Sequence, residues 1–124
     1  MSQFVVLRHE MPTGDHRPSH WDLMLERNGA LWTWSLSELP TPVAWVVAQR
    51  IHDHRLDYLE YEGPISGDRG HVARYDRGSC QIDACDNLSI SARIAGQHLR
   101  GQLRLEKFAG AWRCRMLPAV GQVE

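Results

Sequence analysis

A histidine and an aspartate stand two residues apart in the segment SHWDLMLERNGALWTWSL, residues 19–36. Strand residues at positions i and i+2 point to the same side, roughly 7 Å apart along the backbone. On a strand, the imidazole of His20 and the carboxylate of Asp22 could therefore bind one divalent cation. A solvated strand face, or a plain histidine–carboxylate hydrogen bond, is the commoner explanation of such a pair. The spacing thus indicates two candidate metal ligands, and a third must come from elsewhere.

The seven histidines of the chain offer several choices for this third ligand. His9 ends the first apolar run, and His16 lies in the segment that follows. His52 and His54 form a second pair with the spacing of two residues. The residues alone do not choose among these candidates.

The segment that carries the first pair has the pattern of a β-hairpin. Asn28-Gly29 is a typical two-residue turn, and it would place Arg27 opposite Ala30. This register leaves His20 and Asp22 on one face and matches apolar residues across the hairpin on the other face, a match that a slip of one residue would destroy. The apolar pairs that it predicts are Leu25–Trp32, Leu23–Trp34 and Trp21–Leu36.

The rest of the chain is typical of an antiparallel β protein. Residues 3–8 predict a strand and residues 11–19 a loop. Residues 43–52 could form a strand or a buried helix, and their Val, Ile and Trp content favours a strand. Residues 53–70 should be mostly irregular. Short alternating runs follow: 72–75, then 79–83 after a turn at 76–78, and 88–94, 99–105 and 112–116.

We therefore expect a mainly β chain, with residues 1–124 forming a single compact domain that resembles an antiparallel β-barrel and contains little helix. The 124 residues suit one domain, and 43% hydrophobic residues suffice for a core without disulfides or a structural metal. Three cysteines without CxxC spacing argue against a disulfide framework and favour a reducing cytoplasm. We see no pattern of a signal peptide or of a membrane span, so no membrane contact is expected.

The charge composition limits how the chain could contact a nucleic acid. The formal net charge is −1, so such contact must rest on a local basic patch. Of the fourteen basic residues, only Lys107 is a lysine. Arginine is the better side chain for bidentate contact with phosphate, although a GC-rich genome produces the same bias.

Four segments occur in an order that resembles the 3′-phosphoesterase domain of bacterial DNA ligase D and its free-standing relatives. They are FVVLRH, SHWDLMLERNGALWTWSL, DHRLDYLEYEG and YDRGS. The family pattern has a histidine at the end of the first strand, a His-x-Asp strand, a tryptophan strand, an Asp-His motif followed by Leu-Asp-Tyr, and an aromatic-Asp-Arg-Gly motif. The match runs from Phe4 to about Gly78, and the remainder fits as a β-rich tail.

The resemblance implies a small β-barrel-like domain that removes a terminal ribonucleoside and then a 3′-phosphate from nucleic-acid ends. The metal ligands would be His9, His20 and Asp22, holding Mn²⁺ or another divalent transition metal such as Zn²⁺ or Co²⁺. His54 and Tyr58 would be the catalytic pair at the substrate phosphate, although a tyrosine in this position is more often a core aromatic. The partners would be DNA or RNA 3′ ends and DNA ligase or repair proteins.

Three positions where the family pattern has cations are occupied here by Met24, Glu38 and Val46. Met24 should share the strand face of the metal pair. Met24→Arg would then tighten phosphate binding, unless Met24 is packed among apolar side chains, where an arginine would destabilise the fold. The candidates to replace the missing cations as substrate-binding residues are Arg17, Arg50 and Arg55.

Three functions are compatible with these residues. The first is a metal-dependent phosphoesterase that acts on nucleic-acid 3′ ends in DNA repair. The second is a non-catalytic metal-binding relative that serves as a nucleic-acid or protein binding module, which the loss of the three cations favours. The third is a phosphoesterase with the same site and a different, less anionic substrate.

Overall fold

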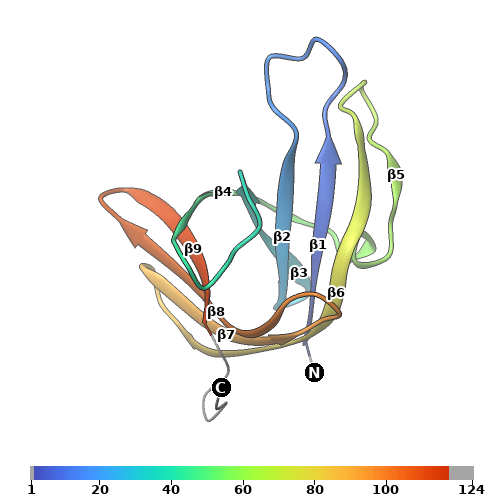
Figure 1. Cartoon of the computed structure of the whole chain (residues 1–124). Helices are drawn as coiled ribbons and strands as arrows, with labels where there is room; N and C mark the ends of the chain where they lie inside the picture. The colour runs from blue at the N-terminus through green and yellow to red at the C-terminus, as the bar shows by residue number, and fades with distance from the viewer. Residues whose placement is uncertain (1, 118–124) are drawn as a thin grey trace.

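Residues 2–117 of the computed structural model form nine β-strands and one short 3₁₀ turn (Figure 1). No helix within this range is long and apolar enough to cross a membrane. The three cysteines are free thiols, of which Cys85 is exposed. The elements are β1 (Ser2–Glu10), β2 (His20–Arg27), β3 (Ala30–Leu36), β4 (Val46–His54), η1 (Leu56–Leu59), β5 (Gly63–Pro64), β6 (His71–Cys85), β7 (Ser89–Ala95), β8 (Arg100–Phe108) and β9 (Ala111–Leu117).

The nine strands form one antiparallel sheet that closes on itself. The strand order is β1-β2-β3-β4-β9-β8-β7-β6-β5, and β1 pairs additionally with β6. This second pairing joins the two sides of the sheet into a barrel, as the sequence predicts. The ends of β1 and β2 that flank residues 11–19 project beyond the barrel (Figure 1).

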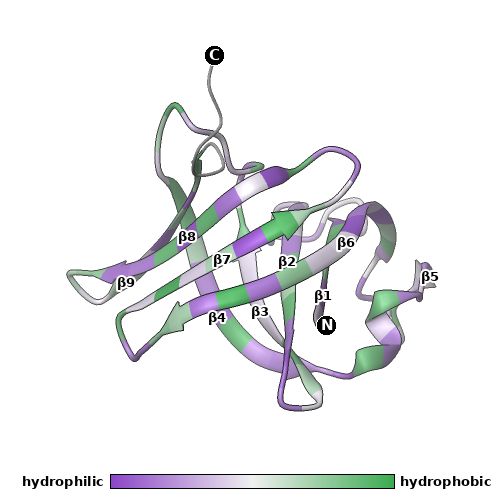
Figure 2. Cartoon of the chain, turned by 90° about the horizontal axis from the view of Figure 1, so that it is seen from below, coloured by the Kyte–Doolittle hydropathy of each residue, from purple (hydrophilic) through white to green (hydrophobic). Residues whose placement is uncertain are grey.

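The hairpin of β2 and β3 has the predicted register. Arg27 lies opposite Ala30, and Trp21 lies opposite Leu36. The turn residues Asn28 and Gly29 have φ values of 55° and 80°, as a two-residue turn matched to the strand twist requires. The apolar pairs Leu25–Trp32, Leu23–Trp34 and Trp21–Leu36 form as predicted. Hydrophilic and hydrophobic residues alternate along several other strands of the barrel (Figure 2).

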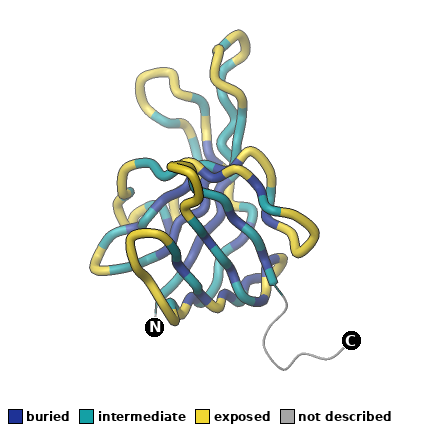
Figure 3. The backbone as a smooth tube through the Cα atoms, turned by 90° about the vertical axis from the view of Figure 1, so that its left-hand side faces the viewer, coloured by how far each residue is buried: buried dark blue, intermediate teal, exposed yellow. Residues whose placement is uncertain are grey.

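Both faces of the β1–β2 pair are buried, each by a different set of side chains. Figure 3 shows that buried residues lie along the strands of the barrel, whereas the loops are mostly exposed. One face, with Phe4 and Leu23, contributes to the core inside the barrel, which also contains residues of six other strands, β3, β4 and β6 to β9. The opposite face packs against η1 and the segment after it. We call this second set the outer core, and its members are Val5, Leu7, Met24, Leu31, Leu59 and Val72, with Tyr58 and Ile65 packed against them.

Strand β4 contains a bulge near its end. Leu31 pairs with His54 and Thr33 with Ile51, so three steps along β4 match two steps along β3. The extra residue brings Ile51 and His54 to the same face of the sheet. The segment 43–52 is thus a strand rather than a helix, as expected, although the strand begins only at Val46 and runs on to His54.

The predicted turn at residues 76–78 is wrong, because β6 runs without interruption from His71 to Cys85. The carboxylate of Asp76 accepts backbone N–H bonds from Arg77, Gln97, His98 and Leu99 at 2.7–3.0 Å. Gly78 lies so close to Ala95 that a Cβ would overlap its carbonyl oxygen. Asp76 and Gly78 therefore allow β6 to pack closely against the turn after β7, and the sequence Asp-Arg-Gly does not itself form a turn.

The first prediction concerns Asp76, which is 3% exposed. Burial raises the pKa of Asp76, but hydrogen bonds from the four backbone N–H groups lower it by more. The net pKa of Asp76 therefore lies below the ordinary 3.8. Asp76→Asn should cost about 2–4 kcal/mol of the free energy of unfolding at pH 7, because charged hydrogen bonds to buried donors are lost. This contribution is present above pH ~3.8 and disappears as the pH falls through the lowered pKa.

Urea unfolding at pH 7 and in acid would measure the difference between the two proteins. Asp83→Asn is the matched control, since Asp83 is exposed and pairs with Arg93 at the surface, where an ion pair contributes less than about 1 kcal/mol. Equal losses in the two variants at pH 7 would contradict the structural role of Asp76.

Candidate functional site

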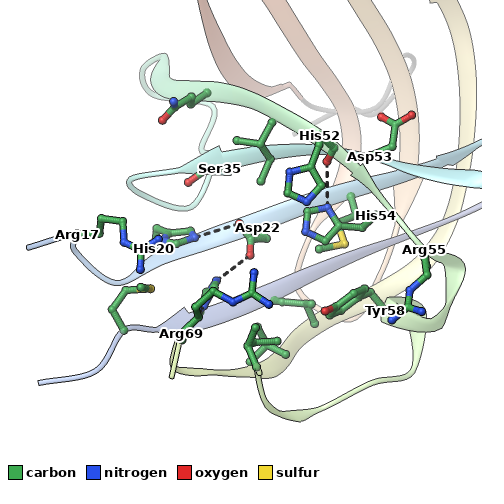
Figure 4. Close-up of a pocket in the computed structure, with 18 residues that line it drawn as sticks. Arg17, His20, Asp22, Ser35, His52, Asp53, His54, Arg55, Tyr58 and Arg69 are labelled. Carbon is green, nitrogen blue, oxygen red and sulfur yellow. Dashed lines mark hydrogen bonds and ion pairs between the residues drawn. The ribbon is translucent and has the colours of Figure 1, made fainter. Parts of the chain in front are cut away.

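A cavity of about 510 Å³ opens on the outer face of β1 and β2 (Figure 4). Leu7 and Met24, which belong to the outer core, form its floor. The end of β4 and η1 contribute His54 and Tyr58, and the loop before β6 contributes Arg69. Segments that are distant in the sequence thus surround a single space above the sheet.

The three predicted metal ligands meet at one end of this cavity. His9 and His20 lie directly opposite each other on β1 and β2, and Asp22 is one alternation further along. His9 Nδ1 lies 3.3 Å from Asp22 Oδ2, and His20 Nε2 lies 3.2 Å from Asp22 Oδ1. One ligand atom of each of the three residues lies within 4.8 Å of the others. Cross-strand pairing therefore brings together the histidines that the sequence leaves eleven positions apart.

Backbone carbonyls orient both imidazoles. His9 Nε2 lies 2.8 Å from the carbonyl oxygen of Arg69, and His20 Nδ1 lies 3.2 Å from that of Pro18. A carbonyl oxygen only accepts, so the nitrogen facing it carries the proton. In each neutral ring the other nitrogen, which faces Asp22, is then free to bind a cation. Such outer hydrogen bonds are the usual support of metal-bound histidines.

Asp22 is a buried carboxylate whose capacity to accept hydrogen bonds is only partly used. It is 3% exposed, and its Oδ1 atom has no hydrogen-bond partner among the described residues. Burial raises the pKa of Asp22, but the imidazoles of His20 and His9 lower it more, so the net pKa is below its ordinary value. An unpaired buried anionic oxygen is costly. A divalent cation would remove this cost, and one oxygen with two nitrogens is a donor set suited to a transition metal.

Asp22 affects His9 in turn. The hydrogen bond with Asp22 raises the pKa of His9, burial opposes this effect, and the Arg69 carbonyl adds to it. Without a cation, His9 therefore holds its proton more tightly than an ordinary histidine. A metal would have to displace that proton from Nδ1, which couples metal binding to pH.

His54 and Tyr58 lie together in the same cavity. Their rings meet edge-on with centroids 5.3 Å apart, and the ring of His52 stacks on His54 at 4.6 Å. His54 Nδ1 donates to the carbonyl of His52 at 3.1 Å, so Nε2 is the unprotonated nitrogen of the neutral ring. Burial lowers the pKa of His54 below 6.5, and the neighbouring His52 lowers it further. His54 is therefore neutral at pH 7.

The three predicted substrate-binding arginines have different positions. Arg17 and Arg55 line the cavity. Arg50 does not: it lies opposite Trp34 on β4, stacks over that indole at 4.7 Å and donates to backbone carbonyls and Asp53. Arg69 also lines the cavity, although the sequence does not predict it as a site residue. Its segment SGDRG contains no signal beyond turn glycines, so only the fold could locate it.

Of the three positions where the family pattern has a cation, two are buried in this structure and one is exposed. Met24 points to the cavity floor, as predicted, but it is 1% exposed within the outer core. An arginine there would bury a charge, so the structure favours destabilisation by Met24→Arg over tighter phosphate binding. Val46 packs inside the barrel, whereas Glu38 is exposed after β3.

Similarity to known proteins identifies the family of this chain. A family model described as the DNA ligase D 3′-phosphoesterase domain matches residues 12–115. The chain belongs to this family. It is also 31% identical over 114 residues to the multifunctional non-homologous end joining protein LigD of Pseudomonas aeruginosa. That alignment covers 86% of this chain but only 13% of the relative, so the chain corresponds to a small part of that protein. The resemblance seen in the sequence motifs is confirmed.

The second prediction tests metal binding through stability. Mn²⁺ should raise the melting temperature, because a ligand that binds only the folded state contributes about 2.7 kcal/mol at 100 times its Kd. Asp22→Ala should abolish the increase, whereas His16→Ala should not, since the His16 side chain is 92% exposed. Equal melting temperatures in chelator and in excess Mn²⁺, Zn²⁺ or Co²⁺ would exclude the site, as would unchanged affinity in Asp22→Ala.

The third prediction tests the support of His9 by the Arg69 carbonyl. Gly70 has φ +83°, and a Cβ there would overlap the carbonyl oxygen of Glu10. Gly70→Ala should displace the loop and lower Mn²⁺ affinity by about 10-fold, the size of effect typical for lost outer hydrogen bonds. Gly67→Ala is the control, because it also has positive φ but meets no backbone. Isothermal titration should separate the two variants, and equal affinities would show that the loop does not support the site.

Proposed function

We propose that this chain is a metal-dependent phosphoesterase that processes nucleic-acid 3′ ends, removing a 3′-phosphate or a terminal ribonucleoside. One observation carries the proposal: a single cavity holds the cluster of His9, His20 and Asp22 together with His54 and Tyr58, in a chain of the DNA ligase D 3′-phosphoesterase domain family. The name of the bacterial relative refers to non-homologous end joining. Processing of DNA ends before ligation, beside DNA ligase or repair proteins, is the corresponding role here.

His9, His20 and Asp22 would hold the metal, with Mn²⁺ as the first candidate and Zn²⁺ or Co²⁺ as alternatives. When bound, such an ion neutralises phosphoryl charge and lowers the pKa of coordinated water. The Arg69 and Pro18 carbonyls keep both imidazoles oriented during turnover. This orientation lets the ligands act without rearrangement.

His54 would handle the proton of the reaction. In the free protein its Nε2 atom is an acceptor, because burial lowers the pKa of His54 and Nδ1 donates to His52. An anionic phosphate bound beside the ring would raise that pKa and favour uptake of a proton. The resulting imidazolium would donate to a phosphate oxygen or to the leaving oxygen. The hydroxyl of Tyr58 would donate a further hydrogen bond to the same phosphate.

The second candidate function is a metal-binding module without catalysis. Burial of Met24 in the cavity floor favours it, because no cation can reach the phosphate from this point of β2. The exposed arginines Arg17 and Arg55 at the cavity would then attract nucleic-acid ends without turning them over.

The fourth prediction separates chemistry from metal binding. With Mn²⁺ and a 3′-phosphorylated oligonucleotide, His54→Ala should lose about 10²–10⁴-fold in kcat, the usual contribution of a general acid. Its Mn²⁺ affinity should not change, because His54 is not in the ligand cluster. His98→Ala serves as the control, being exposed and outside the cavity.

Wild-type turnover in His54→Ala at saturating Mn²⁺ would refute this role. A wild-type protein that binds Mn²⁺ and oligonucleotide but releases no phosphate would favour the binding module. Hydrolysis of a phosphodiester dye without action on the 3′-phosphate would identify the phosphoesterase with a less anionic substrate.

A further inference from the structure

Arg69 is a basic residue of the cavity whose side chain bonds to Ser66 and forms no ion pair with a carboxylate among residues 2–117. It lies in the loop between β5 and β6, and its side chain extends from beneath Asp22 in the direction of Tyr58 (Figure 4). The guanidinium donates from Nε to the Ser66 carbonyl at 2.6 Å and from Nη2 to the Ser66 hydroxyl at 3.3 Å. Both acceptors are neutral, so the positive charge is oriented but not neutralised.

The other arginines near the cavity differ from Arg69 in this respect. Arg17 forms a two-point ion pair with Asp15, and Arg50 is directed to Asp53 and the indole of Trp34. Arg55 is exposed on the far side of Tyr58 and makes no side-chain hydrogen bond that would fix its position among the described residues. Arg69 therefore combines an uncompensated charge with a defined orientation.

The backbone of Arg69 fixes this side chain relative to the candidate metal ligands. Its carbonyl oxygen accepts from His9 Nε2 at 2.8 Å, and the Ile65 N–H donates to the Gly70 carbonyl at 2.8 Å to close the loop. The loop can approach β1 this closely because position 70 is a glycine. The residue that orients His9 through its backbone thus also presents a guanidinium to the cavity.

We propose that Arg69 is the residue that recognises the terminal 3′-phosphate and makes the site prefer a phosphomonoester end over a 3′-hydroxyl end. This proposal rests on the proposed function and deepens it by naming a specificity residue. None of the strand residues that line the cavity is an arginine or a lysine, so the cation comes from a loop and not from the sheet. A guanidinium makes charge-assisted, bidentate bonds to a phosphate dianion, and a neutral hydroxyl offers no such partner.

The experiment compares the binding of one oligonucleotide that ends in a 3′-hydroxyl or in a 3′-methylenephosphonate to the Mn²⁺-loaded protein. The methylenephosphonate is a dianionic analogue of the 3′-phosphate whose P–C bond is not hydrolysed, so the ligand stays intact during the measurement. Wild type should bind the phosphonate form about 10–100-fold more tightly, the range expected for charge-assisted hydrogen bonds. Arg69→Ala should lose this preference and keep its Mn²⁺ affinity, because the variant retains the backbone carbonyl that supports His9. Arg69→Lys should retain part of the preference. Arg74→Ala, an exposed arginine outside the cavity and paired with Glu62, should leave it unchanged.

A retained preference in Arg69→Ala would overturn this assignment, and phosphate release by the same protein would still support the proposed function. Parallel loss of Mn²⁺ affinity in Arg69→Ala would assign Arg69 a structural role and also overturn it. A wild-type protein that shows no preference for the phosphonate end refutes the assignment directly. If that protein also fails to release phosphate, the proposed function fails with it.

Discussion

The pairing of β1 with β2 is the interaction on which the candidate site depends. It places His9 directly opposite His20, with Asp22 on the same face. This face is held still because both sides of the strand pair are buried, one by the barrel core and the other by the outer core under η1. Polar metal ligands can be accessible on this face of β1 and β2 only beyond the side chains of the outer core. The outer core thus ends at Leu7 and Met24, and the ligand cluster begins there.

Local periodicity was sufficient to predict the hairpin and much of the sheet. Alternation and an Asn-Gly turn determine the register of β2 and β3, because any slip would expose Leu23 and Trp34. The same local reasoning fails at Asp76, where Asp-Arg-Gly predicts a turn but lies within β6. The carboxylate bonds to residues 97–99 across the barrel, and no neighbouring residue indicates that contact. The bulge in β4 that brings Ile51 and His54 to one face was likewise invisible, since it arises from pairing with β3.

The residues of the candidate site also differ in how far the sequence predicts them. His9, His20, Asp22, His54 and Tyr58 were identified from ordered motifs, and the structure brings all five to one cavity. The cations were harder to predict, because an arginine can reach a cavity from many backbone positions. Arg50 is turned toward Trp34, and Arg69 enters from a loop whose sequence is that of an ordinary turn. The candidate metal ligands are therefore positioned by strand pairing, and Arg69 is positioned by a loop, so only the former could be predicted from strand patterns.

Two carbonyl-oriented imidazoles and one buried carboxylate would form the proposed metal site on β1 and β2. Anomalous X-ray diffraction from crystals soaked in Mn²⁺ would locate the ion. We expect one strong manganese peak bonded to His9 Nδ1, His20 Nε2 and an Asp22 oxygen, with the Arg69 and Pro18 carbonyls still bonded to the outer ring nitrogens. A fully soaked crystal with no peak between these three residues, or with manganese bound only elsewhere, would contradict this proposal.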